Sequence, residues 1–451
     1  MNENKMGTVP VNKLLVSMAT PMVLSMLVGA LYNVVDSLFV SHYGENALSA
    51  VSLAFPIQNI IIATGTGVGV GINALLSRYL GQKEQKAVNQ TALHGILLGI
   101  VFYVIICFFG LFCVRKFYLI QTPDAEIVSM GVDYLTIICV FGFGQLFQLI
   151  FEKILQSTGR TAYTMVMQIV GAILNIVLDP IFIFGYFGLP AMGTKGAAIA
   201  TVIGQIVAML LGVYFNLTKN KDVQFGLKDF QLNGSYIKAI CEVGIPTIIM
   251  QSMSSIMCFG INKLLLAFST TATAVFGAYF KLQTFVYMAV FGLNNALISI
   301  VAFNVGAQRG ERVKKVIRLC GLYSVMIGLI GTLIMGLFPV QLINAFAPSE
   351  EMFALGVPAL RILALSFVFG GISVMSSYAL QGFSKGIPSL IISAARQVIV
   401  LLPLAYILGN AIGIYGIWWI FLISETVTVV FAILYLVHAE KKELEHISPV
   451  L

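Results

Sequence analysis

Long apolar stretches separated by short polar turns follow one another from residue 13 to residue 438. A bilayer core about 30 Å thick is crossed by roughly 20 apolar residues in a helix that rises about 1.5 Å per residue. The predicted spans are 13–38, 48–74, 89–113, 127–150, 161–185, 190–216, 237–264, 270–302, 316–340, 352–379, 387–409 and 412–438. The pattern therefore predicts an all-α integral membrane protein with about twelve transmembrane helices.

Neither a membrane β-barrel nor a cleaved signal peptide accounts for the apolar stretches. A transmembrane β-barrel shows strands of about ten residues with alternating polarity, whereas these runs are long and continuous. The first run exceeds the length of a signal-peptide core, and no A-x-A-like cleavage site follows it, so we expect it to stay in the protein.

Composition narrows the class of protein further. Hydrophobic residues make up 59% of the 451 positions and charged residues 10%, whereas soluble domains carry about 25% charged residues. This excludes a soluble enzyme, a disordered chain and a nucleic-acid binder. The six cysteines lie in or beside apolar runs without a C-x-x-C pair, and the four histidines are scattered, so we expect no metal centre of Cys or His and no bound cofactor.

The basic residues indicate the orientation in the membrane. With the N-terminus in the cytoplasm, 19 of the 26 lysines and arginines fall on the inner side, Lys153 among them, and only Arg115, Lys116 and Lys195 fall outside. Because Lys and Arg accumulate in cytoplasmic loops, both termini are predicted to be cytoplasmic. The net charge of +7 is thus a topology signal and implies no nucleic-acid partner.

An internal repeat emerges when the chain is shifted by 225 positions. Pro21 then falls on Pro246 and Gly67 on Gly292; further along, after a slip of a few residues, Gly196 pairs with Gly416. Each half holds about six helices, an even number, so the halves share one orientation as parallel repeats.

The repeat divides the chain into two pseudo-symmetric lobes. We expect an N-terminal six-helix lobe over 1–216, a cytoplasmic linker over 217–236 and a C-terminal six-helix lobe over 237–451. Two similar lobes that face each other enclose a central chamber, which is the architecture of alternating access.

Four oxygen-bearing residues are predicted at one depth of the N-terminal lobe. Asp36 and Asp179 lie in the outer halves of two outward-running helices, and acids within a span indicate function. Asn175 precedes Asp179 by one turn, and Thr201 lies in the outer half of the next helix.

Two carboxylates with an amide and a hydroxyl suit either a shared proton or a small hard cation such as Na⁺. Pro180 has no N–H, so the Ile176 carbonyl could supply a further oxygen. A structural role, with one acid at the interface and the other beside the proline kink, stays open. At the 225 shift Asp36 falls on Ile261, so the shared fold does not need the acid.

A second set of charges lies in the C-terminal lobe. Arg396 and Glu425 are predicted near the membrane midplane, and Lys281 at a similar depth. Because unpaired charges are rare there, we expect Glu425 to pair with Arg396 or Lys281, either as a structural latch or in contact with substrate.

Several segments resemble the multidrug and toxic compound extrusion (MATE) transporters, and the likeness covers essentially the whole chain. They are PMVLSMLVGALYNVVDSLFVSHYGENALSAVSLAFPI from Pro21, SRYLGQKE from Ser77, LQSTGRT from Leu155 and NIVLDPIFIFGYFGLPAMGTKGAAIAT from Asn175. Glu425 in LISE is similar to a residue of the MepA-like bacterial branch.

The resemblance implies two six-helix lobes in a V and export of cationic, amphipathic compounds in exchange for H⁺ or Na⁺, in a bacterial cell membrane. It implies an ion-coupling role for Asp36, Asn175, Asp179 and Thr201. Members that couple through the C-terminal lobe carry a Glu in helix 7, whereas residues 251–255 read QSMSS here. We expect a monomer in the bilayer whose partners are small organic cations.

Other classes fit the sequence less well. A lipid or polysaccharide-precursor flippase of the same superfamily, the main alternative, favours a strongly basic chamber, but only four scattered basic residues lie within the spans. A major-facilitator transporter should read like G-x-x-x-D-R-x-G-R after helix 2, where this chain has SRYLGQKEQK. No catalytic constellation lies at depth, and a purely structural protein has no need for the two acids.

Overall fold

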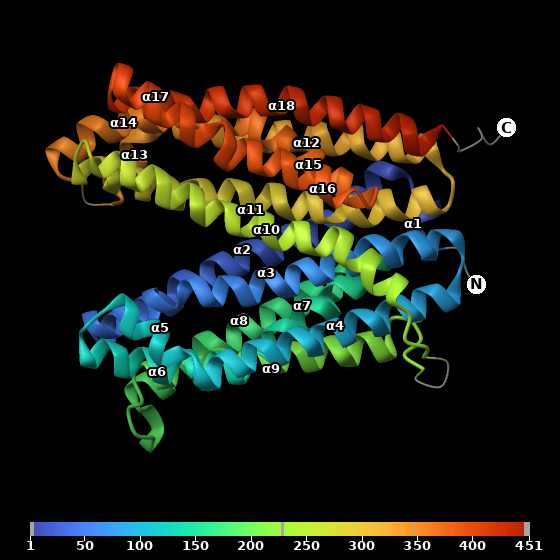
Figure 1. Cartoon of the computed structure of the whole chain (residues 1–451), viewed down its shortest axis with the longest axis horizontal. Helices are drawn as coiled ribbons and strands as arrows, with labels where there is room; N and C mark the ends of the chain where they lie inside the picture. Colours follow the sequence, from blue (N-terminus) through green and yellow to red (C-terminus); the bar gives the residue numbers. More distant parts are fainter. Residues whose placement is uncertain (1–3, 227–229, 347, 446–451) are drawn as a thin grey trace. The chain divides into compact units, whose positions relative to one another are not determined.

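The computed structural model describes residues 4–226, 230–346 and 348–445 (Figure 1). Across these ranges the regular secondary structure is helical, with no strand. Ten helices are long and apolar enough to cross a membrane, and two bent helix pairs bring the number to as many as twelve. The prediction of an all-α membrane protein with about twelve spans is confirmed.

The described residues of the first half form nine α-helices and a 3₁₀ turn. They are α1 (Lys5–Thr8), α2 (Val11–Tyr43), α3 (Glu45–Gln82), α4 (Gln85–Phe112), α5 (Val114–Gln121), α6 (Ala125–Val140), α7 (Phe143–Ser157), α8 (Thr161–Phe184), η1 (Tyr186–Gly188) and α9 (Thr194–Thr218).

The second half contains the remaining helices. They are α10 (Gly234–Leu266), α11 (Thr270–Gly306), α12 (Gly310–Leu337), α13 (Pro339–Asn344), α14 (Glu350–Ala364), α15 (Phe367–Gly382), α16 (Gly386–Ala394), the π-helix η3 (Ala395–Ile399), α17 (Leu401–Ile412) and α18 (Ile414–Leu444).

The repeat is visible in the lengths of corresponding helices. Helices α2 and α10 both have 33 residues, and α4 and α12 both have 28. The fourth span of each half is a bent pair, by 42° between α6 and α7 and by 46° between α14 and α15. Pro21 and Pro246 lie inside the matching helices α2 and α10. The predicted pseudo-symmetry is therefore a property of the fold.

The bends are the main departure from the predicted spans. Single spans were expected over 127–150 and 352–379, but the helices break after Val140 and after Ala364. At the second break the Ser366 hydroxyl donates to the Leu363 carbonyl at 2.7 Å, and such a side-chain bond competes with the helical ladder. A run of apolar residues carries no signal for such a bend.

The helices group into two compact units. Unit 1 comprises residues 1–23 and 249–451, and unit 2 comprises residues 24–248. The division falls within α2 and within α10, at two points 225 residues apart. The division follows the repeat. The boundaries of the lobes predicted from the sequence, 1–216 and 237–451, stay a prediction.

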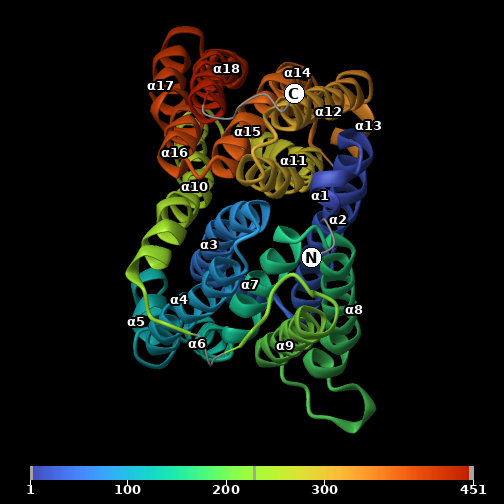
Figure 2. The same cartoon turned by 90° about the vertical axis from the view of Figure 1, so that its right-hand side faces the viewer.

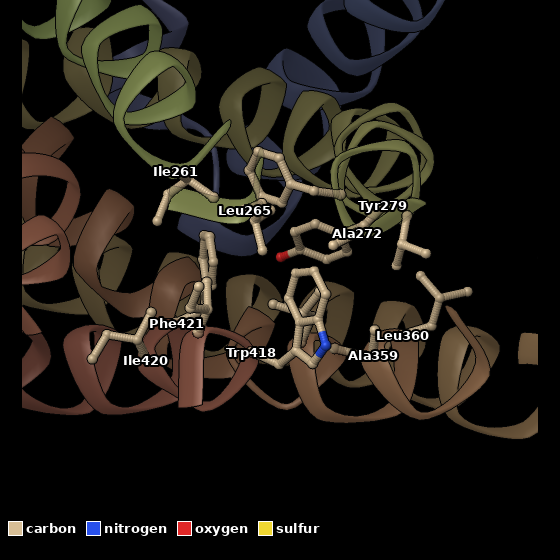
Figure 3. Packing of buried hydrophobic residues seen from close by; sticks show 14 of the residues in the cluster. Ile261, Leu265, Ala272, Tyr279, Ala359, Leu360, Trp418, Ile420 and Phe421 are labelled. Carbon is tan, nitrogen blue, oxygen red and sulfur yellow. The ribbon is translucent and has the colours of Figure 1, made fainter. Parts of the chain in front are cut away.

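Each unit has its own apolar core. In unit 1, α11, α12, α15 and α18 pack against one another (Figure 2). Figure 3 shows part of this core, where Trp418, Tyr279 and Phe421 meet Leu265 and Leu360. In unit 2, α3 packs on α7 and α8 on α9, around a core that includes buried Tyr118 and Tyr134.

The segment between α9 and α10 is held on unit 2. Asp222 forms an ion pair with Arg160 at 2.9 Å, and its carbonyl accepts from Gln85. The backbone N–H of Asn233 donates to Nε2 of the buried His94 at 3.0 Å. The linker expected over 217–236 is thus non-helical over the described part of 219–233 and packed against the unit.

Candidate ion site

The four predicted residues of the first set come together in unit 2. Asp36 lies in the outer part of α2, Asp179 and Asn175 lie one turn apart on α8, and Thr201 lies near the start of α9. The carboxyl groups of Asp36 and Asp179 are within hydrogen-bonding reach of each other. The structure therefore brings together the four side chains that the sequence placed at one depth of the membrane.

Asn175 connects the acid on its own helix to the hydroxyl on the next. In the amide orientation that satisfies both neighbours, its nitrogen donates to Asp179 at 2.9 Å and its oxygen accepts from the Thr201 hydroxyl at 3.1 Å. The spacing of four residues places Asn175 and Asp179 on one face of α8. The contact between α8 and α9 brings Thr201 within reach.

The site is shielded from solvent on the α8 side. Asp179 is fully buried, and Asn175 and Thr201 are almost so, at 2% and 4% exposed. Oδ1 of Asp36 is buried and accepts no hydrogen bond from the described residues. Burying an ionised carboxylate is costly unless a positive charge or donors compensate it. Asp179 and the half-buried Asp36 beside it can reduce that cost by sharing a proton or by binding a cation.

Two tyrosines lie beside Asp36, and neither was predicted from the sequence. Tyr32 lies one turn before Asp36, where its hydroxyl meets Thr201. The hydroxyl of the buried Tyr134 on α6 accepts from Gln58 at 2.7 Å and lies close to Asp36. The i–4 spacing in LYNVVD could have indicated Tyr32. Nothing in the sequence of α6 indicates Tyr134.

The second predicted set is only partly assembled. Nη1 of Arg396 lies 3.5 Å from Oε1 of Glu425, so these two residues form an ion pair in unit 1. Lys281 is exposed on α11. Of the two partners expected for Glu425, the structure selects Arg396.

One basic residue lies elsewhere than its sequence position suggests. Lys153 was counted among the basic residues of the inner side, outside the predicted spans, and it is buried on α7 at 3% exposed. Its neighbour Glu152 is also buried and accepts from the Gln156 amide at 2.7 Å. The predicted span ended at residue 150, whereas α7 continues to Ser157 inside the unit.

The repeated helical fold and the adjacent pair of acids within its helices define a multi-pass membrane transporter. The family model described as MatE matches residues 21–181 and 246–407, two segments whose starts lie 225 residues apart, as in the internal repeat. The chain belongs to the MatE family. Its members compared below are transporters rather than enzymes.

Relatives agree with this assignment over almost the whole length. The multidrug export protein MepA of Staphylococcus saprophyticus is 24% identical over 417 residues, which cover 92% of this chain and 91% of that protein. The FAD transporter of Shewanella oneidensis is 24% identical over 409 residues and 90% of each chain.

Solved structures show the same fold. An outward-facing multidrug resistance MATE transporter matches with a TM-score of 0.93 and 26% identity over 99% of both chains. A transporter from Pyrococcus furiosus matches with a TM-score of 0.92 and 26% identity, over 98% of this chain and 99% of that one.

Proposed function

We propose that the protein is a secondary active antiporter that exports cationic, amphipathic organic compounds in exchange for H⁺ or Na⁺. The cluster of Asp36, Asp179, Asn175 and Thr201 is its coupling site. The proposal places it as a monomer in a bacterial cell membrane, with both termini cytoplasmic and without a bound cofactor.

The adjacency of the half-buried Asp36 and the fully buried Asp179 carries the proposal. Such a pair changes its charge when one ion binds, because two adjacent carboxylates resist simultaneous ionisation. A coupled transporter needs a group that is loaded on one side of the membrane and emptied on the other. The multidrug export proteins among the relatives support organic compounds as the transported class.

The test is gradient-driven uptake of ethidium into vesicles that contain the purified full chain. Under an imposed pH or Na⁺ gradient, Asp36→Asn and Asp179→Asn should each abolish uptake. The double variant should be no worse than either single one, since residues that act as a unit are non-additive.

Asp133→Asn is the matched control, because Asp133 also belongs to unit 2 but its side chain is 45% exposed and paired with Lys195 at 3.2 Å. It should transport like the parent protein. Ethidium binding without a gradient should survive in all variants, and their thermal unfolding should show that they are folded. Full gradient-driven uptake by Asp179→Asn would remove this site from the coupling mechanism.

Export of an anionic dinucleotide is a second candidate function. The relative from Shewanella oneidensis named FAD transporter favours it, because it matches 90% of the chain. Competition of FAD with ethidium in the same vesicles separates the two. Uptake of FAD with no uptake of ethidium would favour this second function.

A further inference from the structure

The ion pair in unit 1 is looser than a structural latch requires. Arginine–carboxylate pairs that hold structure are commonly bidentate, with N–O distances of about 2.7–2.9 Å. Here Nη1 of Arg396 and Oε1 of Glu425 are 3.5 Å apart, and no hydrogen bond joins them. The two groups are attracted by charge, and Tyr287 and Ser373 lie beside the Glu425 carboxylate, but Nη1 of Arg396 and Oε2 of Glu425 make no hydrogen bond within the described residues.

Several buried polar atoms without hydrogen bonds lie at this ion pair. Nη1 of Arg396, Oε2 of Glu425 and the hydroxyl of Ser373 beside it are buried and lack hydrogen-bond partners within the described chain. Buried polar atoms are nearly always partnered in native proteins. A donor atom and an acceptor atom on adjacent groups of opposite charge, each without a hydrogen bond, indicate a place where a ligand can supply hydrogen-bond partners.

Aromatic rings border the pair. The Arg396 guanidinium lies over the ring of Tyr287 at 5.6 Å, within the range of a cation–π contact. Tyr287 packs edge-on against Phe367 at 6.0 Å and beside Phe291 at 5.9 Å. Phe421 lies one turn before Glu425 on α18 and packs edge-on against Tyr279, and both rings are visible in Figure 3.

The local backbone is shaped to bring these groups together. Arg396 lies in the π-helix η3, a rare distortion that is frequent at functional sites. The Ser424 hydroxyl donates to the Arg396 carbonyl at 3.0 Å and ties this turn to α18. A Cβ added at Gly370 would lie 2.2 Å from the Tyr287 hydroxyl and 3.1 Å from Oε1 of Glu425, so the glycine leaves room for both groups. The side chains of Arg396 and Glu425 keep 13% and 10% exposure, so the pair is not sealed.

We propose that Arg396 and Glu425 form a binding site for aromatic zwitterions, compounds that carry an ammonium and a carboxylate a few ångströms apart beside an aromatic ring. The ligand's carboxylate binds Arg396, its ammonium binds Glu425, and its ring packs among Tyr287 and its aromatic neighbours. The site lies in unit 1 and shares no residue with the ion site of unit 2. The inference rests on the proposed function only in treating the ligand as an exported compound.

Charge balance selects a zwitterion over a simple ion. A cation at Glu425 would compete with Arg396 and leave a buried guanidinium without its partner, which is costly. An anion at Arg396 would orphan Glu425 in the same way. A zwitterion replaces the single 3.5 Å contact by two charge-assisted bonds and leaves the net charge of the site unchanged.

The test is equilibrium binding by titration calorimetry on the purified full chain, with three matched probes. They are 2-naphthylalanine, its methyl ester, which is a cation, and its N-acetyl derivative, which is an anion. The zwitterion should bind at least about tenfold more tightly than either derivative, because each lacks one charged hydrogen-bonding group. No gradient is needed, so the result is independent of ion coupling.

Two single variants identify which residue recognises which charge. Glu425→Gln should remove the preference over the N-acetyl derivative and keep the preference over the ester. Arg396→Gln should do the opposite. The double variant leaves no orphaned charge, so it should fold even if a single variant does not, and it should bind all three probes equally.

Three results would overturn the proposal. Equal binding of the ester and the zwitterion would make the site a cation site. Absence of zwitterion binding to the folded parent protein would remove the site altogether. Variants that lower the unfolding temperature without changing the order of the three affinities would show that the pair is a structural latch. If the zwitterion binds but the Asp36 and Asp179 variants still export ethidium fully, the coupling proposal fails and this one stands.

Discussion

At the scale of single residues, Thr201 distinguishes the two possible coupling ions. Its hydroxyl donates to Asn175 beside Asp179, and it is the residue of the cluster that can lose its oxygen without loss of charge or size. Na⁺ needs about five or six oxygen ligands, whereas a shared proton needs only the two carboxyls. Thr201→Val should therefore abolish Na⁺-driven ethidium uptake and preserve H⁺-driven uptake.

The measurement compares the two gradients in the same vesicle preparation. Thr164→Val on α8 is the control, because its hydroxyl is buried and donates to the Thr161 carbonyl, away from the acids. Loss of both activities in Thr201→Val, with the protein folded, would contradict the distinction and assign Thr201 to the fold of the site.

Two glycines that the repeat pairs also have the same packing role. A Cβ on Gly196 would lie 2.4 Å from the Phe182 carbonyl oxygen, and one on Gly416 would lie 2.3 Å from that of Leu408. Each glycine lets the start of a helix approach the backbone of the helix before it. Gly196→Ala and Gly416→Ala should each lower the free energy of unfolding by about 1–3 kcal/mol.

Thermal unfolding in detergent measures this loss. Gly336→Ala on α12 is the control, because nothing lies within 4 Å of the added Cβ. Its unfolding temperature should hold or rise slightly, since alanine favours the helix. An unchanged unfolding temperature in Gly416→Ala would show that the end of α17 moves enough to make room for the added methyl group.

The residues of the ion site were predictable to different degrees. Acidic residues inside an apolar span stand out, and the helical rise gives their depth, so Asp36 and Asp179 could be found from the sequence. Tyr134 could not, because a tyrosine in a membrane helix is indistinguishable from an ordinary apolar ring until the packing of α6 is known. The burial of Lys153 could not be predicted either, because it depends on where α7 ends.

At the scale of elements, a short N-terminal helix is clamped onto unit 1. Arg312 donates to the carbonyls of Met6 at 3.0 Å and Val9 at 2.7 Å, and Asn304 donates to Met6 at 3.2 Å. Met6 is completely buried. The carbonyls near a chain terminus rarely have such partners, so α1 belongs to the folded unit rather than to a loose tail.

Arg312→Ala should release this helix. Three hydrogen bonds from a charged group are lost, two to the carbonyls of Met6 and Val9 and one to the Asn304 side chain, which should lower the free energy of unfolding by about 2–3 kcal/mol. In a Met6→Cys protein whose native cysteines are changed to alanine, a maleimide should react slowly, and Arg312→Ala should accelerate the reaction. Arg318→Ala, at an exposed position of the same helix, should leave both quantities unchanged. Equal labelling in all three proteins would show that α1 is open without the mutation.

The spans were predictable because hydropathy and helix length are both properties of the local sequence. Their bends were not, because a single glycine or serine, such as Gly142 and Ser366 at the two breaks, is also common inside unbroken membrane helices. The π-helix at Arg396 was likewise invisible, since it depends on the contact that Ser424 makes from α18.

At the scale of the whole molecule, the predicted orientation leads to a labelling pattern. Glu45 and Glu84 are both exposed, and they flank opposite ends of α3. With the N-terminus cytoplasmic, an impermeant maleimide should label Glu45→Cys in intact cells and Glu84→Cys only after permeabilisation. The reverse pattern would invert the topology and place the two acids in the inner half of the membrane. The unmutated cysteine-free protein is the background control.

The division of α2 and α10 between the two units has a consequence for biosynthesis. Residues 1–23 leave the ribosome first, yet the rest of their unit starts at residue 249, after all of unit 2. At about 5–20 residues per second, they wait roughly 10–45 s for the first of their partners. Unit 2 can assemble as soon as residue 248 has emerged, whereas unit 1 needs both the earliest and the latest parts of the chain. The order of synthesis therefore lets unit 2, which contains the ion site, fold first. Residues 1–23 are synthesised early, but they are the last part of the early chain to reach their packing partners.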